Sequence, residues 1–153
     1  MSPRGPVTQP DYQAMAEFRY QIRRFLRFSE SAARQAGLEP QQYLMLLALK
    51  GLPDGQSGRI GALAERLQIQ HHSTVELVDR LEKRGMVRRR RSENDRREVM
   101  LELSPRGEKV LRDLALYHRE ELRELAPGLV RSLKKAVTET RRPARAARPE
   151  RRA

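Results

Sequence analysis

The feature that most constrains this chain is a change of hydrophobic period in its middle. Residues 59–67 and 73–84 each place apolar side chains at the three- and four-residue spacing of an amphipathic helix, and only the short stretch QIQHHS joins them. In residues 99–103 the apolar side chains instead alternate with Met100 and Glu102, which is the period of a half-buried strand. Two short helices followed by a strand predict a helix-turn-helix that leads into β structure.

A strongly basic run, RRRRSENDRRE at residues 88–98, lies between the second helix and the alternating segment. Such a run is either a solvated charged tract or the tip of a folded hairpin. Met86 and Val87 give the run an apolar start, and the Ser, Asn and Asp in its middle favour a turn. These flanks favour two strand ends around a four-residue turn, and a basic hairpin directly after a helix-turn-helix is a winged helix.

Long helices are predicted on both sides of this region. Apolar residues, including all three phenylalanines, recur at helical spacing over residues 12–37. Residues 40–51 predict a buried helix that is apolar nearly all round and has a proline in its first turn. Ser104 is the expected N-cap of a leucine-striped helix that is bent or broken at residues 127–128. The fold class expected is mainly α with a small β-wing (α+β).

The two ends of the chain differ in composition from the rest. Residues 1–11 are rich in proline and are expected to form a flexible lead-in. Residues 138–153 are expected to be a disordered basic tail of low complexity. The net charge is +12, of which residues 141–153 supply +5, so +7 belongs to residues 1–140. A basic balance favours an anionic partner such as nucleic acid or an acidic membrane, although a highly soluble basic protein has the same balance.

Composition and motifs exclude several classes of function. The chain has no cysteine, which excludes disulfides, thiolate zinc sites and thiol redox sensing. It has no glycine-rich phosphate loop, paired-carboxylate pattern or Ser-His-Asp arrangement, so no enzyme and no cofactor are expected. His71, His72 and His118 do not have metal-site spacing, and no metal is expected. The longest apolar run is too short to cross a bilayer, and no signal-peptide core is present, so we expect a cytoplasmic protein without a membrane partner.

Four stretches resemble, in order and spacing, the MarR-type winged-helix transcriptional regulators. They are LEPQQYLMLLAL, IGALAERLQIQHHSTVELVDRLEKRGMVRR, DRREVMLELSPRG, and the long helices before and after, which together cover residues 12–137. The resemblance implies a homodimer in which residues 12–37 and 105–137 are dimerisation helices and residues 40–103 are the DNA-binding lobe. An ordinary intramolecular helical bundle is the alternative for the long helices.

The resemblance also implies that the helix from about His72 to Arg84 is the recognition helix. Its core-facing side chains are expected to be Val75, Leu77, Val78 and Leu81. The candidates for contact with DNA are His72, Ser73, Thr74, Glu76, Arg80 and Lys83. The N-terminal end of a helix attracts phosphate, which suits the first of these. Glu76 departs from the family pattern, since relatives often have a basic or neutral residue there.

In the wing, Asp95 and Arg97 match the Asp-x-Arg signature of the family. The resemblance implies that Asp95 ties the hairpin to a nearby arginine, for which Arg89 is the candidate. It also implies that Arg97 enters the minor groove, where a narrow A·T-rich groove concentrates negative potential. Arg90, Arg91 and Arg96 are expected to contact phosphates. The alternative for each arginine is an ordinary surface charge.

The function implied by the resemblance is transcription regulation, usually repression. A homodimer would bind a palindromic operator in double-stranded DNA and be released by a small aromatic or phenolic effector. The candidate effector-binding residues are Tyr12, Arg19, Tyr43 and His118. The alternatives are a sequence-independent, architectural DNA-binding protein and a module that binds a protein partner. Operator, effector, target genes and the role of the arginine-rich tail do not follow from the sequence.

Overall fold

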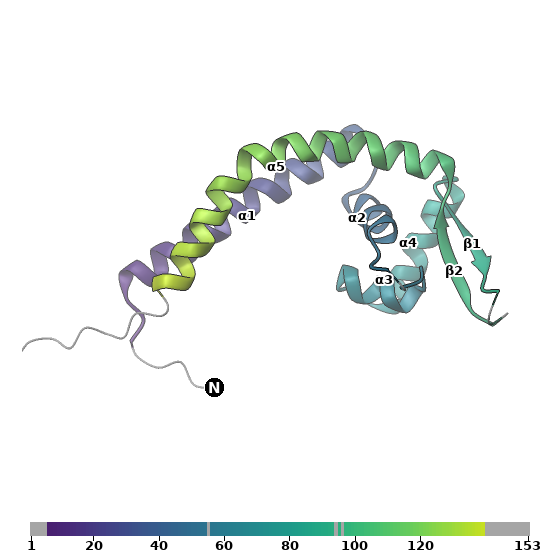
Figure 1. The fold of residues 1–153 in the computed structure, drawn as a ribbon, viewed down its shortest axis with the longest axis horizontal. Helices are drawn as coiled ribbons and strands as arrows, with labels where there is room; N and C mark the ends of the chain where they lie inside the picture. Colours follow the sequence, from purple (N-terminus) through teal and green to yellow (C-terminus); the bar gives the residue numbers. More distant parts are fainter. Residues whose placement is uncertain (1–5, 55, 94, 96, 140–153) are drawn as a thin grey trace, which may run out of the picture. The chain divides into compact units, whose positions relative to one another are not determined.

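The computed structural model describes residues 6–54, 56–93, 95 and 97–139 (Figure 1). Within them the chain forms five helices and a two-stranded hairpin, in the order α1 (Gln9–Gln35), α2 (Pro40–Lys50), α3 (Ile60–Leu67), α4 (His71–Lys83), β1 (Val87–Arg91), β2 (Val99–Leu103) and α5 (Pro105–Glu139). The mainly helical fold with a small β-wing is therefore confirmed.

The chain divides into two compact units. Residues 28–120 form the first, which we call the lobe, and it contains α2, α3, α4, the hairpin, the end of α1 and the first half of α5. The rest of α1 and of α5 belongs to the second unit, which we call the helical unit.

The core of the lobe takes one apolar stripe from each of its helices. Its most deeply buried side chains are Leu38, Met45, Leu46, Leu63, Val78 and Leu81. The hairpin closes this core from one side through Val87 and Leu101. β1 and β2 pair antiparallel, with Val87 opposite Leu103 and Arg91 opposite Val99. Burial of these apolar stripes fixes which face of each helix remains in contact with water.

A third backbone segment pairs with the hairpin and has no counterpart in the sequence prediction. Arg59 forms an isolated antiparallel bridge with Met100, and the Leu101 N–H donates to the carbonyl of Gly58 at 2.8 Å. A Cβ at Gly58 would lie 2.4 Å from the Leu101 carbonyl oxygen, so only glycine fits. In the sequence this segment shows only a lone glycine before a helix, and such a glycine does not by itself indicate a strand.

Two helices begin earlier than the sequence predicted. α1 starts at Gln9 rather than Tyr12, because the Thr8 hydroxyl and backbone N–H both donate to the Asp11 carboxylate at 2.7 Å. Residues 9–11 are therefore helical and not part of a flexible lead-in. α4 starts at His71, because Gln68 adopts a left-handed conformation that ends α3 and shortens the connection.

Three further predictions about the elements were wrong. α2 is not buried all round, since Leu44 and Leu47 keep 43% and 42% of their surface exposed. The connection between the strands spans residues 92–98 and not four residues, because pairing stops at Arg91 and Val99. α5 is not broken at Pro127, which lies inside the helix, and it includes residues 138–139, which the sequence assigned to the tail. The tail from residue 140 onward lies outside the described residues.

We expect Gly107→Ala to lower the free energy of unfolding by roughly 1–3 kcal/mol, because overpacking is costly. Its Cβ would lie 2.1 Å from the Met86 carbonyl oxygen, where the hairpin enters the lobe. The matched control is Gly61→Ala in α3, where nothing lies within 4 Å of the new Cβ. It should raise stability by about 0.5–1 kcal/mol through higher helix propensity. Urea unfolding of the two variants measures both, and equal shifts would contradict this packing.

Candidate nucleic-acid interface

The exposed face of α4 is polar along its whole length. His72, Glu76, Arg80 and Lys83 are exposed and Ser73 is half-buried, while Leu77, Val78 and Leu81 on the opposite side are buried. The Arg80 Nε makes only a long bond of 3.4 Å to the Glu76 carbonyl. α4 therefore presents basic and hydrogen-bonding side chains on one face, as an element that enters a DNA groove must.

Thr74 does not belong to this exposed face. Its side chain is fully buried, and its hydroxyl donates to the Gln70 carbonyl in the first turn of α4 at 3.0 Å. A buried hydroxyl with a satisfied bond has neither the access nor the free donor for a phosphate or a base. The candidate contact at Thr74 is therefore dropped, and the residue has a structural role in the N-terminal turn of the helix.

Arg89 pairs with carboxylates of α4 and not with Asp95, so it links the hairpin to α4. Its guanidinium donates to the carboxylates of Asp79 and Glu82, and its backbone N–H donates to the Glu82 Oε1 at 3.2 Å. The bond to Asp79 raises the pKa of Arg89 above its ordinary value, and Glu82 adds to the effect. The predicted pairing of Asp95 with Arg89 is therefore wrong, because Arg89 lies on the side of β1 that packs on α4 and meets Asp79 and Glu82 there.

Asp95 acts within the tip of the hairpin. Its Oδ1 accepts the backbone N–H of Arg97 at 2.9 Å, and its carbonyl accepts the N–H of Glu98 at 2.9 Å. An Asp that bonds its own backbone two residues on is a common turn-forming arrangement. The Asp95–Arg97 pair therefore holds the turn through the backbone and leaves the Arg97 side chain exposed.

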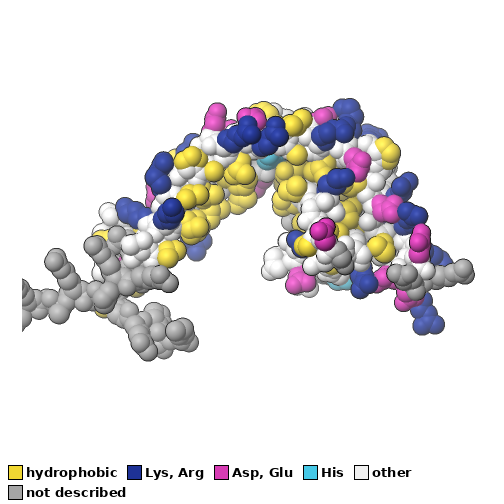
Figure 2. All heavy atoms as spheres, in the orientation of Figure 1, with side chains coloured by type: hydrophobic (Ala, Val, Ile, Leu, Met, Phe, Trp, Pro, Cys, Tyr) yellow, Lys and Arg dark blue, Asp and Glu magenta, His cyan; other side chains and the backbone are white. Residues whose placement is uncertain are grey.

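The arginines of the hairpin differ in their partners. Glu102 pairs with Arg88 at 3.3 Å and with Arg90 at 3.0 Å, both on the solvent side of the strands. Glu98 pairs with Arg59 at 2.5 Å. The exposed side chains of Arg91 and Arg97 have no carboxylate partner in the part of the chain that the structure describes, and Arg96 lies outside it. Figure 2 shows this mixture of Lys or Arg with Asp or Glu side chains around the hairpin.

Two of the four effector candidates lie together. Tyr43 and His118 stack with ring centroids 4.7 Å apart and planes at 11°, and both are buried. The Ser29 hydroxyl lies 2.9 Å from the His118 Nε2, and the Leu114 carbonyl lies 2.8 Å from its Nδ1. Burial raises the pKa of Tyr43. Tyr12 and Arg19 are on the part of α1 that belongs to the helical unit.

The described residues contain neither a metal-binding cluster nor a membrane-spanning helix. None of them forms a group of three or more His, Asp or Glu side chains that could hold a metal ion. None of the described helices is long and apolar enough to cross a membrane.

Comparison with known proteins identifies the family. Residues 36–98 match the MarR family model. The chain is 32% identical over 114 residues to the uncharacterized HTH-type transcriptional regulator YcgE of Bacillus subtilis, covering 74% of this chain and 72% of the relative. It is 31% identical over 91 residues to the uncharacterized HTH-type regulator YsmB of the same organism, of which it spans only 60%. The chain belongs to the MarR family of winged-helix transcriptional regulators.

A solved structure has the same fold. The MepR–DNA complex of Staphylococcus aureus superposes with a TM-score of 0.63 at 19% identity, covering 88% of this chain and 96% of that chain. At this identity the likeness establishes the fold.

We expect Arg89→Gln to loosen the hairpin, because it leaves the Asp79 and Glu82 carboxylates without their shared partner. The loss of stability should be about 1 kcal/mol, since the carboxylates are partly exposed and the pairs are screened. Arg88 pairs with Glu102 on the solvent side, and Arg88→Gln should change stability by less than about 0.5 kcal/mol. Thermal unfolding and hydrogen exchange of the β1 and β2 amides measure the difference. Equal exchange rates in the two variants would show that Arg89 does not hold the hairpin on α4.

Proposed function

We propose that this protein is a DNA-binding transcriptional regulator that uses α4 and the hairpin as its contact surface. The observation that carries the proposal is the exposed polar face of α4 next to a hairpin whose Arg91 and Arg97 are not engaged by any carboxylate of the described residues. Membership of the MarR family supports the same conclusion. The known complex of MepR with DNA shows that this fold accommodates a duplex.

We assign the following roles to the contact residues. Ser73 and His72, at the N-terminal end of α4, are placed to bind a phosphate, which the helix dipole also attracts. Arg80 and Lys83 lie about two and three turns further along the exposed face and suit base edges or the opposite phosphate strand. Glu76 lies between Ser73 and Arg80 on this face. Its carboxylate accepts a hydrogen bond from a cytosine amino group or disfavours the other bases. Arg97 is assigned to the minor groove.

A homodimer is part of the proposal. The helical unit leaves several large apolar side chains of α5 exposed, and Val130, Leu133 and Val137 are each 46–47% exposed. Their spacing of three and four residues places them on one helical stripe. Tyr12 and Met15 of α1 are also exposed in this unit. Apolar stripes of this size on a long helix are typical of a subunit interface, and two lobes would then read a palindromic operator.

Repression and release by a small effector complete the proposed mechanism. A dimer binds its operator in one arrangement of its two lobes, and a molecule that binds another arrangement more tightly lowers the affinity for DNA. The proposed place of action is the cytoplasm.

Selection of bound duplexes from a random pool by the purified protein tests the proposal. A palindromic motif with two half-sites is expected, because two copies of α4 read equivalent bases. Enrichment of DNA without a motif would support the architectural alternative. Absence of any binding at low salt would leave the winged helix as a module for a protein partner and overturn the proposal.

We expect Arg97→Gln to weaken binding to the selected duplex, because the variant loses one cation near the DNA phosphates. The slope of the logarithm of the binding constant against the logarithm of the salt concentration should become shallower by about one unit per lobe. Arg34→Gln removes the same charge from α1, where Arg34 pairs with Glu30, and serves as the control. Fluorescence anisotropy over a series of salt concentrations measures both. If the two variants bind alike, Arg97 has no role in the interface.

We expect Glu102→Gln to strengthen DNA binding, because this carboxylate engages both Arg88 and Arg90. Freed arginines neutralise additional phosphates, so the affinity at low salt should rise and the salt dependence should become steeper by about one or two units per lobe. Glu30→Gln, which frees only Arg34 on α1, is the matched control. Unchanged affinity in Glu102→Gln would show that these two arginines do not face DNA.

We expect Leu133→Asp to convert the dimer into monomers, because a carboxylate on the exposed α5 stripe opposes burial in an interface. Leu116→Asp replaces an equally exposed leucine of α5 within the lobe and should leave the dimer intact. Sedimentation velocity measures the assembly state. A wild-type protein that sediments as a monomer at all concentrations would contradict the dimer.

A further inference from the structure

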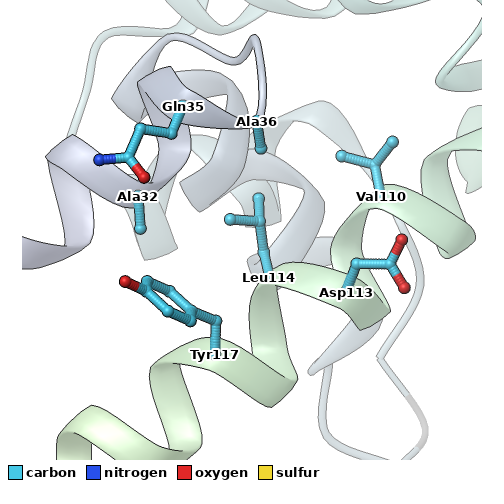
Figure 3. A pocket seen from close by; sticks show the side chains of 7 residues that line it. All are labelled: Ala32, Gln35, Ala36, Val110, Asp113, Leu114 and Tyr117. Carbon is cyan, nitrogen blue, oxygen red and sulfur yellow. The ribbon is translucent and has the colours of Figure 1, made fainter.

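Two features of the lobe are not used by the contact surface proposed above. One is a groove of about 530 Å³ between the end of α1 and the first half of α5, lined in part by Leu114 and Tyr117 (Figure 3). It has the size of a small-molecule site and is left to the effector step of that proposal. The other is the ion pair between Arg59 and Glu98, which connects the start of α3 with the tip of the hairpin. Because Glu98 directly follows Arg97, this pair bears on how the lobe meets DNA.

Glu98 is held in place by the backbone of the hairpin tip. Its N–H donates to the Asp95 carbonyl at 2.9 Å, and its carbonyl accepts the Ser92 N–H at 2.9 Å. Its side chain is only 25% exposed, whereas that of Arg59 is 59% exposed. The carboxylate is therefore the fixed member of the pair, and the guanidinium is the accessible one.

Arg59 is brought to this carboxylate by the backbone pairing of its own segment. Arg59 forms the bridge with Met100, and the carbonyl of the preceding Gly58 accepts the Leu101 N–H. Arg59 is also the N-cap residue of α3, but its side chain makes no capping bond there. Figure 1 shows α3 and the end of the hairpin at the same end of the lobe. The long cation at the start of α3 is therefore directed to the hairpin and does not cap its own helix.

The pair holds the Arg59 guanidinium by one edge only. The Glu98 Oε1 lies 2.5 Å from the Nε, and the two Nη groups have no acceptor among the described residues. These two groups form the end of the planar fork with which arginine binds phosphate. In Arg90, by contrast, the Nη1 is taken by Glu102 at 3.0 Å. Glu98 thus fixes the position of the Arg59 guanidinium and leaves the end of its fork open.

We propose that Arg59 is a further DNA-contact residue, which binds a backbone phosphate with its Nη groups, and that Glu98 is its positioning residue. The inference rests on the proposed function, since it adds a contact to the same surface. An arginine that is free in solution has to be immobilised when it binds, which weakens binding about two- to tenfold per side chain. The carboxylate of Glu98 removes most of this loss, because it orders the guanidinium before DNA arrives.

Arg59→Gln tests the contact by fluorescence anisotropy with the selected duplex and with an unrelated duplex of equal length. The affinity for both should fall by roughly tenfold per lobe, because a phosphate contact is charge-assisted and independent of sequence. The slope of the logarithm of the binding constant against the logarithm of the salt concentration should become shallower by about one unit per lobe. Arg34→Gln, which breaks the exposed Arg34–Glu30 pair of α1, is the matched control and should change neither quantity.

Arg59→Lys separates the fork from the charge. An ammonium keeps the positive charge but lacks the planar pair of donors, so the slope with salt should stay as in the wild type. The affinity should still fall by about threefold per lobe, because the phosphate loses its second hydrogen bond. Arg59→Lys with the full affinity of the wild type would contradict binding through the Nη groups.

Glu98→Ala tests the positioning role through a double-mutant cycle. In this background Arg59→Gln should cost no more than about threefold per lobe, since the unsupported guanidinium has to be immobilised by the DNA itself. In a Glu30→Ala background, the matched control, Arg59→Gln should keep its full effect. In the protein without DNA, NMR relaxation of the Arg59 Nε–H group should show a fixed side chain in the wild type and a mobile one in Glu98→Ala. The Leu101 amide, which is bonded to Gly58, should stay protected from hydrogen exchange in both.

An Arg59→Gln variant that binds like Arg34→Gln would overturn the contact, and a loss confined to the selected duplex would overturn its assignment to phosphate. Equal costs of Arg59→Gln in the wild type and in Glu98→Ala would overturn the positioning role. Faster exchange of the Leu101 amide together with the loss of affinity would also overturn it, because the pair would then only stabilise the hairpin. A wild-type protein that binds neither duplex contradicts the proposed function, whereas a wild type that binds no better than Arg59→Gln leaves that function standing and removes only this inference.

Discussion

The ion pairs of Arg89 with Asp79 and Glu82 determine where the hairpin lies relative to α4. A two-stranded hairpin is marginal by itself and needs packing against other elements. Here Val87 and Leu101 supply the apolar contact, and Arg89 adds a directional one from the same side of the strands. Because Arg89 faces α4, the alternate residues Arg88 and Arg90 face solvent. The register of β1 on α4 therefore decides which arginines of the hairpin face solvent.

The same logic governs α4. Leu77, Val78 and Leu81 are buried in the lobe, which leaves Glu76, Arg80 and Lys83 on the exposed side. Packing therefore decides which side chains are available to DNA, and Thr74 is removed from the surface for that reason. Ion pairs with carboxylates then determine which hairpin arginines remain available to DNA. Glu102 engages two of them, so a count of arginines overestimates the cations that are available for phosphates.

The sequence predicted the elements and their order because each depends on local periodicity and capping. Ser104 caps α5 as expected: its hydroxyl accepts the Gly107 N–H at 3.0 Å. Gly85 has the positive φ predicted for the end of α4.

What escaped prediction depends on contacts between distant segments. The partners of Arg89 follow from how the hairpin packs on α4, and the pairing of Arg59 with Met100 from how the segment before α3 meets β2. The burial of Thr74 follows from the packing of α4 in the lobe. The groove beside Tyr117 joins residues more than seventy positions apart and leaves no pattern along the chain. The DNA-contact residues themselves remain predictions, with Thr74 withdrawn.

The central claim is that α4 and the hairpin tip together form the DNA-binding surface. The most direct measurement is an NMR titration of the labelled protein with a selected duplex and with an unrelated duplex of equal length. We expect the largest shifts at His72, Ser73, Arg80 and Arg97, with the α4 shifts present only for the selected duplex. Shifts confined to elements other than α4 and the hairpin, or the same shifts with both duplexes, would contradict it.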